Sequence, residues 1–492
     1  LQTTGAISPG IVVQSVGGGG GFSGDSQGDA ILGSSDSSGD LGVNGSSGLL
    51  YPVACPVGSC LVKPVEQALL VDIQGAITTT GVTSPVMVVQ AIGGGGGRLS
   101  QVEGNAVLGM ESSTGTADGG SIRVISNGGA SLTSLGDHST ALMVQSIGGG
   151  GGSVNDVEGT LRLGSQGLGS STGGSITLNG PFTAITQGEE SPGVVLQAIG
   201  GGGGYASDVA GNRLRLGTLS TGNTAAGAVR AISANWQIST EGVNSPGLIL
   251  QSIGGGGGVA YTNEASVSMG GDVVGSTRAD AVSFISKFNS RIQTTGSSSP
   301  AVIAQSIGGG GGYVGGDGSG RAPLVDLGGG GTQLGGSGSV ELTISRGTQL
   351  ITAGTESQGI LAQSIGGGGG YTSQNGLVMR LGMTGGRGNA GDVTVDNQGS
   401  ITTLGSSSEG ILAQSIGAGG GSAGNSQNSL VLGADNAIGD AGDVVVNNRN
   451  GRISTAGSYS IGVVAQSVGG GGGRVGRANG SMTLGANNGG GN

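Results

Sequence analysis

The chain has few of the residues that carry most enzyme chemistry. Of its 492 residues, one is histidine (His138) and two are cysteine, charged residues make up 10% and aromatic residues 2%. A Ser/His/Asp or Cys/His catalytic device needs a histidine, so it would have to be built around His138. The surrounding GDHST segment is typical of a solvated corner. The composition therefore argues against an ordinary enzyme, and we expect no cofactor.

Basic residues are also scarce. Lys and Arg total 18 against 29 Asp and Glu, which gives a net charge of −11, and the arginines are scattered along the chain. Nucleic-acid binding requires a basic stripe or patch that contacts phosphates. The charge pattern thus excludes nucleic acid as an expected partner.

The two cysteines, Cys55 and Cys60, lie close together in CPVGSC. A lone C-x4-C pair lacks two of the ligands of a structural zinc site. We expect a small local disulfide in an oxidising compartment, with free thiols as the alternative. The sequence contains no signal peptide and no apolar run of about 18 residues. We expect any export signal to lie outside this segment.

Proline is too scarce, at 10 residues, and glycine too clustered for collagen, although 119 residues are glycine. Many of the glycines belong to a motif that recurs nine times: an apolar strand, Gln-Ser/Ala-Ile/Val, and five small residues. Eight of the nine blocks are Gly5, and the remaining block carries Ala418. The motif glutamines are 51 to 76 residues apart, at Gln14, Gln90, Gln145, Gln197, Gln251, Gln305, Gln363, Gln414 and Gln466.

Each unit of about 53 residues contains four short β-like runs. In the unit that begins at Ala390 they are Val393–Val395, Ser400–Leu404, Ile411–Ile416 and Leu430–Leu432. Short strands, tight corners and a fixed period predict an all-β parallel β-solenoid. Each unit suits two small coils or one large one, and two coils would give a body on the order of 85 Å long.

The repeat sets the domain organisation. We predict one solenoid array over residues 1–492, with an insertion at 34–64 that contains the CPVGSC loop. The array begins and stops in phase with the repeat and shows no polar capping repeat at either end. We therefore expect it to be part of a longer array.

The glycine blocks follow strands that are apolar on both faces, and such strands are normally covered on both sides. We predict that the blocks form an ordered outer glycine layer over the third strand of each unit, whereas a loose surface loop is the alternative. The nine glutamines would then stack as a structural ladder of amide hydrogen bonds.

A broken row of aromatic residues follows the glycine blocks, at Phe22, Tyr205, Tyr313 and Tyr371, with Tyr261 two positions later than the others. One hypothesis is that these rings stack on glycans. The other is that they close the glycine corner.

Other motifs give little support for chemistry. The phosphate-binding GxxxxGK[ST] sequence is absent, and any GxGxxG match is uninformative in this composition. Glu189 and Glu190 are the only adjacent acidic pair, and we interpret them as solvated turn charges rather than paired catalytic carboxylates. We predict no catalytic and no metal-binding residues.

The segments SPGIVVQSVGGGGG, SQGILAQSIGGGGG, AGDVTVDNQGSITTLG and SLVLGA resemble the glycine-rich passenger repeats of very large autotransporter-type surface proteins (adhesins) of Gram-negative bacteria. This resemblance covers the chain except for about 34–64. It implies an exported β-solenoid passenger on the cell surface or released as a fibre. It also implies that contact with the membrane is made only through a barrel domain outside this segment.

We therefore expect a non-enzymatic extracellular protein, a surface stalk or fibre that mediates adhesion or biofilm formation. Its expected partners are a host or neighbouring-cell surface, or glycans. The first alternative is a self-assembling matrix filament, in which the chain associates with copies of itself. The second is a glycan-binding or glycan-processing solenoid that uses the aromatic row or the inserted loop.

Overall fold

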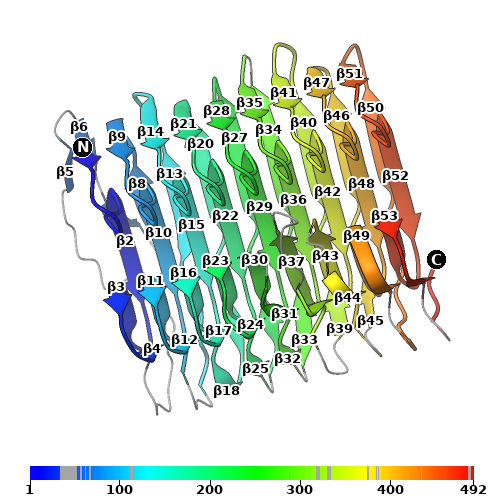
Figure 1. Ribbon diagram of the computed structural model, residues 1–492, viewed down its shortest axis with the longest axis horizontal. Coiled ribbons are helices and arrows are strands. Elements are labelled where there is room, and N and C mark those ends of the chain that lie inside the picture. Colours follow the sequence, from blue (N-terminus) through cyan, green and yellow to red (C-terminus); the bar gives the residue numbers. More distant parts are fainter. Residues whose placement is uncertain are drawn as a thin grey trace.

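A computed structural model describes residues 1–492 except 34–52, 56–57, 61, 66–67, 111–114, 221, 263, 274, 288, 317–321, 330–333, 374–375, 384, 386, 434 and 486–488. Within this described part the chain forms strands and turns and contains no helix. The strands stack side by side from the N-terminal to the C-terminal end (Figure 1). The described residues accordingly include no helix long and apolar enough to cross a membrane.

Three nine-stranded sheets run through the stack. We number them by their order along one repeat. The first sheet contains β7 (Val62–Val65), β8 (Ala68–Asp72), β13 (Ser121–Ile125), β20 (Ile176–Gly180), β27 (Val229–Ala234), β34 (Val282–Lys287), β40 (Val340–Ile344), β46 (Val393–Asn397) and β50 (Val444–Asn448). The second contains β1 (Gln2–Thr3), β9 (Gly75–Thr79), β14 (Ala130–Ser134), β21 (Phe182–Thr186), β28 (Gln237–Thr240), β35 (Arg291–Thr294), β41 (Gln349–Thr352), β47 (Ser400–Thr403) and β51 (Arg452–Thr455).

The third sheet carries the apolar strands that end in the glutamine motif. Its strands are β2 (Ile11–Val16), β10 (Met87–Ile92), β15 (Leu142–Ile147), β22 (Val194–Ile199), β29 (Leu248–Ile253), β36 (Val302–Ile307), β42 (Ile360–Ile365), β48 (Ile411–Ile416) and β52 (Val463–Val468).

The fourth sheet has 17 strands, because most coils contribute one strand that begins with glycines and a second that carries the LVL-type run. Its strands are β3 (Gly20–Ser26), β4 (Ala30–Leu32), β11 (Gly96–Val102), β12 (Ala106–Leu108), β16 (Gly151–Val157), β17 (Leu161–Leu163), β23 (Gly203–Val209), β24 (Arg213–Leu216), β30 (Gly257–Tyr261), β31 (Ser266–Met269), β37 (Gly310–Gly315), β38 (Leu324–Leu327), β43 (Gly368–Thr372), β44 (Gly376–Leu381), β49 (Gly419–Leu432), β53 (Gly472–Ala478) and β54 (Ser481–Leu484).

Three small sheets complete the described fold. Two lie between the fourth sheet and the next coil's first strand, and the third is a two-stranded hairpin inside the insertion. Their strands are β18 (Gln166–Leu168), β25 (Leu219–Ser220) and β32 (Asp272–Val273); β19 (Ser171–Thr172), β26 (Thr224–Ala225), β33 (Ser276–Arg278), β39 (Leu334–Gly336) and β45 (Arg387–Asn389); and β5 (Val53–Cys55) with β6 (Gly58–Cys60).

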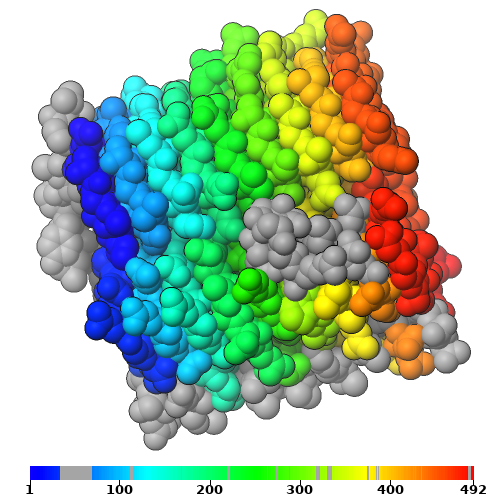
Figure 2. All heavy atoms as spheres, in the orientation of Figure 1, coloured from blue at the N-terminus to red at the C-terminus, as the bar shows by residue number. Residues whose placement is uncertain are grey.

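Every repeat makes one large coil. Apart from β5, β6 and β7, which form antiparallel pairs, the strands pair in parallel with the equivalent strands of neighbouring repeats. For example, β42 pairs with β36 and β48, and Gln363 lies opposite Gln305 and Gln414. We number the coils 1 to 9 by their glutamines, from Gln14 to Gln466. Nine rungs spaced by about 4.8 Å make a stack about 40 Å long, half the length that two coils per repeat would give. The predicted parallel β-solenoid is confirmed, and Figure 2 shows its coils as successive bands across one face.

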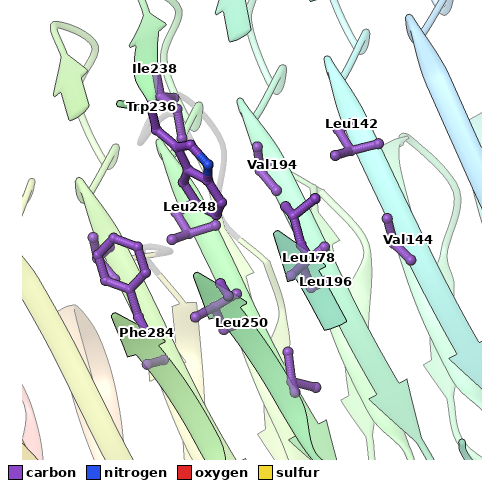
Figure 3. Close-up of a cluster of buried hydrophobic side chains, with 14 of the residues drawn as sticks. Leu142, Val144, Leu178, Val194, Leu196, Trp236, Ile238, Leu248, Leu250 and Phe284 are labelled. Atoms are coloured by element: carbon purple, nitrogen blue, oxygen red, sulfur yellow. The ribbon is translucent and has the colours of Figure 1, made fainter. Parts of the chain in front are cut away.

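The third sheet lies in the middle of the coil, between two apolar layers. One face packs with the first and second sheets around alternating residues such as Val194, Leu196 and Leu248. Phe182, Trp236 and Phe284 fill this layer in coils 4 to 6, with ring centroids of neighbours 4.5 and 5.9 Å apart. Figure 3 shows Trp236 and Phe284 in this layer, near Leu248 and Leu250. The other face carries the residues between them, such as Val195 and Ile249, and contacts the glycine-led strands.

Candidate functional columns

The glycine blocks form ordered, buried strands. In β23, Gly203 and Gly204 pair with Gly257 and Gly258 of the next coil and with Gly151 and Gly152 of the previous one. The equivalent glycines of the interior coils are buried as well. The predicted ordered glycine layer is therefore confirmed. The prediction of an outer layer is wrong, because a further core around residues such as Leu99 and Leu163 covers its other side and places the layer inside the fold.

These strands adopt a backbone that only glycine tolerates. The φ angles of Gly203 and Gly204 are +129° and +141°, close to the mirror image of an ordinary strand. A Cβ atom on Gly203 would lie 2.1 Å from the Gly257 carbonyl oxygen, and one on Gly204 would lie 1.9 Å from that of Gly152. Successive side chains would thus point within the sheet at opposite neighbours, which explains why the block is glycine at these positions.

The glutamines form one hydrogen-bonded column. Each side-chain Nε2 donates to the Oε1 of the next glutamine over 2.6–2.8 Å, from Gln14 through to Gln466. The same Nε2 also lies 3.2–3.5 Å from the carbonyl oxygen of the last residue of its own glycine block, as Gln197 does from Gly204. The column thereby ties the third sheet to the glycine layer while satisfying buried amide groups.

A serine column runs beside the glutamines, and sequence reasoning missed it. A serine stands six residues before every motif glutamine, and its Oγ accepts a hydrogen bond from the backbone N–H of the serine in the previous coil over 2.7–3.0 Å. The residue before each serine has a positive φ, between 48° and 60°. The constant spacing was the available signal, but the changing residues around each serine hid it.

The tyrosines of the aromatic row are buried. Tyr205, Tyr313 and Tyr371 are at most 1% exposed, and Tyr261 completes their stack, with neighbouring centroids 5.6–5.8 Å apart. The Tyr205 and Tyr313 hydroxyls each donate to a corner carbonyl oxygen over 2.9 Å. These rings have no free face for a sugar, so the glycan-stacking hypothesis is wrong for all three. Phe22, in the first coil, is 47% exposed.

In coils 2 and 9 the position directly after the glycine block is an arginine, Arg98 or Arg474, and a neighbouring coil has serine there. Arg98 is completely buried, and its Nη1 donates to the Asn155 Oδ1 over 3.1 Å while its Nη2 donates to the Thr83 carbonyl oxygen over 3.1 Å. Burial lowers the pKa of Arg98 to about 10. Arg474, in coil 9, pairs with the fully buried Glu409 of coil 8. Each long side chain therefore extends past a small row residue, Ser153 or Ser422.

Acidic groups cluster at the corner that precedes the third sheet. Burial raises the pKa of Glu356 to about 7, with Arg474 acting in the opposite direction and Glu409 in the same direction. Burial also raises the pKa of Glu409, against the effect of Arg474. Both carboxyl groups therefore hold their protons at higher pH than a solvated glutamate does.

The acidic pair of coil 4 is split by its surroundings. Glu189 is exposed, whereas Glu190 is only 7% exposed, so the prediction of two solvated turn charges is wrong for Glu190. His138 of coil 3 is not a solvated corner residue either. Its ring lies 3.3 Å from a Glu190 carboxylate oxygen and 3.6 Å from one of Asp208, and its side chain is 20% exposed.

Cys55 and Cys60 lie on β5 and β6, which pair antiparallel, and their disulfide stays a prediction. Most of the insertion at 34–64 lies outside the described residues. Among the described residues, no three His, Cys, Asp or Glu side chains are arranged to hold a metal ion. Comparisons with protein-family models, curated proteins and solved structures find no match for this chain. The columns themselves join neighbouring coils through hydrogen bonds.

Proposed function

We propose that the chain is a non-enzymatic extracellular structural protein, a rigid stalk or fibre that mediates adhesion or biofilm formation at the surface of a Gram-negative bacterium. One observation carries the proposal: hydrogen-bonded columns run without interruption through all nine coils. The glutamine column alone makes a contact at each of the eight coil boundaries.

A solenoid of this kind resists bending because no flexible joint separates its units. The third sheet keeps its register at every boundary, from Met87 opposite Ile11 to Ile416 opposite Val468. Apolar layers on both of its faces join each coil to the next. These features suit a spacer that holds a binding surface at a fixed distance from a cell.

Two measurements on the purified, fluorescently labelled chain test the proposal: its association state and its effect on biofilm mass. Light scattering should show a monomer, and labelled chain anchored on bacterial cells should increase cell aggregation and biofilm mass over cells that carry the anchor alone. The matched control is a chain with Gly258→Ala, which weakens the stack between coils 4 and 5 and should lose part of the gain. Equal biofilm mass with and without the chain would contradict the adhesive role.

A self-assembling matrix filament is the second candidate. The exposed and partly exposed positions that alternate along the first and second sheets, such as Arg123, Thr177 and Thr133, turn one face of each sheet to solvent. Flat sheet faces can pack laterally. Electron micrographs of concentrated protein separate the two functions: regular lateral contacts between rods support the filament, and isolated rods support the stalk.

A further inference from the structure

His138 is the single histidine of the chain and lies on a coil boundary. It occupies the corner position of coil 3 with φ of +54°, the same position that Glu190 occupies in coil 4 and Asn244 in coil 5. Its backbone N–H donates to the Glu189 carbonyl oxygen over 2.8 Å, and its carbonyl oxygen accepts from the Asn155 Nδ2 over 2.9 Å. The first bond ties the backbone of this corner to coil 4, and the second holds it within coil 3.

Both nitrogens of the ring face carboxylates of the next coil. Nδ1 lies 3.3 Å from the Glu190 Oε2, and Nε2 lies 3.6 Å from the Asp208 Oδ2. Glu190 is fixed in turn, because its Oε2 accepts from the Asp208 backbone N–H over 3.0 Å. A ring between two carboxylates satisfies both only when both of its nitrogens carry protons, which is the charged imidazolium form.

The other charged groups near the ring act in the same sense. Asp137 precedes His138 in the corner, and Asp156 of β16 interacts electrostatically with the ring. On the side of coil 2, Arg98 extends to Thr83 and Asn155 rather than to the ring. Burial of the ring acts to lower the pKa of His138, but the nearby carboxylates of Glu190, Asp208 and Asp137 act to raise it, and the pKa is raised overall.

We propose that His138 is an acid-strengthened latch between coils 3 and 4, in which its imidazolium bridges Glu190 and Asp208 and releases them when the ring loses its proton. A raised folded-state pKa adds stability below the unfolded value of 6.5, and this contribution is lost as pH rises through the folded value. The boundary therefore tightens in mildly acidic surroundings. The latch is a property of the array and does not depend on the function proposed above.

Histidine NMR tests the latch directly, because the folded chain gives one set of imidazole signals. We expect a titration midpoint above 6.5, lowered by E190Q and by D208N, and unchanged by E341Q, which removes an exposed carboxylate of β40 in coil 7. A midpoint at or below 6.5, or one that D208N leaves unchanged, overturns the proposal. Asp208 has a half-exposed side chain, so D208N keeps the test open if E190Q does not fold.

Amide exchange gives the second readout. The N–H groups of His138 and Ser139 bond to Glu189 and Ser191 across the boundary. Their protection, corrected for intrinsic exchange, should fall from acid to alkaline pH by up to tenfold for each unit by which the midpoint exceeds 6.5. H138N introduces the residue type that Asn244 provides at the same corner of coil 5. In this variant the fall in protection should be smaller than in the natural chain, and the remainder belongs to Glu190, whose pKa is raised by burial. Equal pH dependence in H138N and the natural chain would refute the latch.

Discussion

Replacing Gly258 by alanine tests the glycine strands most sharply. Gly258 lies in coil 5 with φ of +141°. Its new Cβ would lie 1.9 Å from the Gly204 carbonyl oxygen and 3.1 Å from the Gln197 Nε2. Ordinary contacts with a Cβ begin at 3.4 Å, so coils 4 and 5 would have to separate locally by about 1.5 Å. Because the obstructing atom belongs to the backbone, no rotation of a side chain relieves the clash.

The free-energy cost of G258A has two contributions. A non-glycine residue in this region of φ costs about 1–3 kcal/mol. Separating the strands also disturbs the Gly204–Gly258 pairing and the bond from Gln197 to Gln251, each contributing about 1 kcal/mol. We therefore expect G258A to lower the local free energy of unfolding by about 3–5 kcal/mol, which is large for one methyl group.

Urea unfolding followed by the fluorescence of Trp236 measures this loss. Trp236 is the only tryptophan, is fully buried, and belongs to coil 5 as Gly258 does. The control is G128A, because a Cβ on Gly128 meets no atom closer than 4.0 Å. If both variants unfold at the urea midpoint of the natural chain, the in-plane clash does not govern the choice of glycine and the reasoning fails.

Four further outcomes follow from the buried columns. In Q251L, Gln197 and Gln305 each lose an amide partner. The free energy of unfolding, followed by Trp236 fluorescence, should therefore fall by about 2 kcal/mol. Because the pKa of Glu356 is raised to about 7, its protonated carboxyl stabilises the fold below pH 4.5, and this stabilisation is lost as pH rises through about 7. The free energy of unfolding should therefore fall by up to about 3 kcal/mol over that range. In E356Q the urea midpoint should change less with pH. R474M leaves the Glu409 charge buried without its partner, so amide exchange in coil 8 should show a loss of about 3 kcal/mol in the free energy of opening. The double variant R474M/E409M should largely restore it. Nitration with tetranitromethane, mapped by mass spectrometry, should modify the 85% exposed Tyr459 and spare Tyr205, Tyr261, Tyr313 and Tyr371, and equal modification would contradict their burial.

The repeat made the fold predictable. Spacing of the motif glutamines placed every strand of the third sheet, and the runs Val393–Val395 and Ser400–Leu404 correspond to β46 and β47. Apolar residues on both faces of Ile360–Ile365 correctly indicated a cover on each side. These inferences succeeded because the repeat period follows from the stacking of coils, and the alternation of apolar residues follows from which strand faces are buried.

Contacts between coils were harder to predict. Tyr261 stands two residues after the row position, yet two residues along a strand return a side chain to the same face, and it joins the stack. Glu190 and His138 resemble solvated corner residues because their neighbours in sequence are polar. Their partners lie in the adjacent coil, more than 50 residues away in the case of His138 and Glu190, and a single sequence does not reveal which corner side chains turn inward.

The direction of the pairing has a mechanical consequence. Backbone hydrogen bonds between coils run parallel to the long axis of the stack, so a pull on the two ends loads the coil boundaries in series. Only the outermost boundary has to open at a time. Each opened coil releases about 53 residues, which extend to about 180 Å, while the folded stack shortens by only about 4.8 Å. A pulled array should therefore lengthen in steps, each limiting the force on the coils that remain folded.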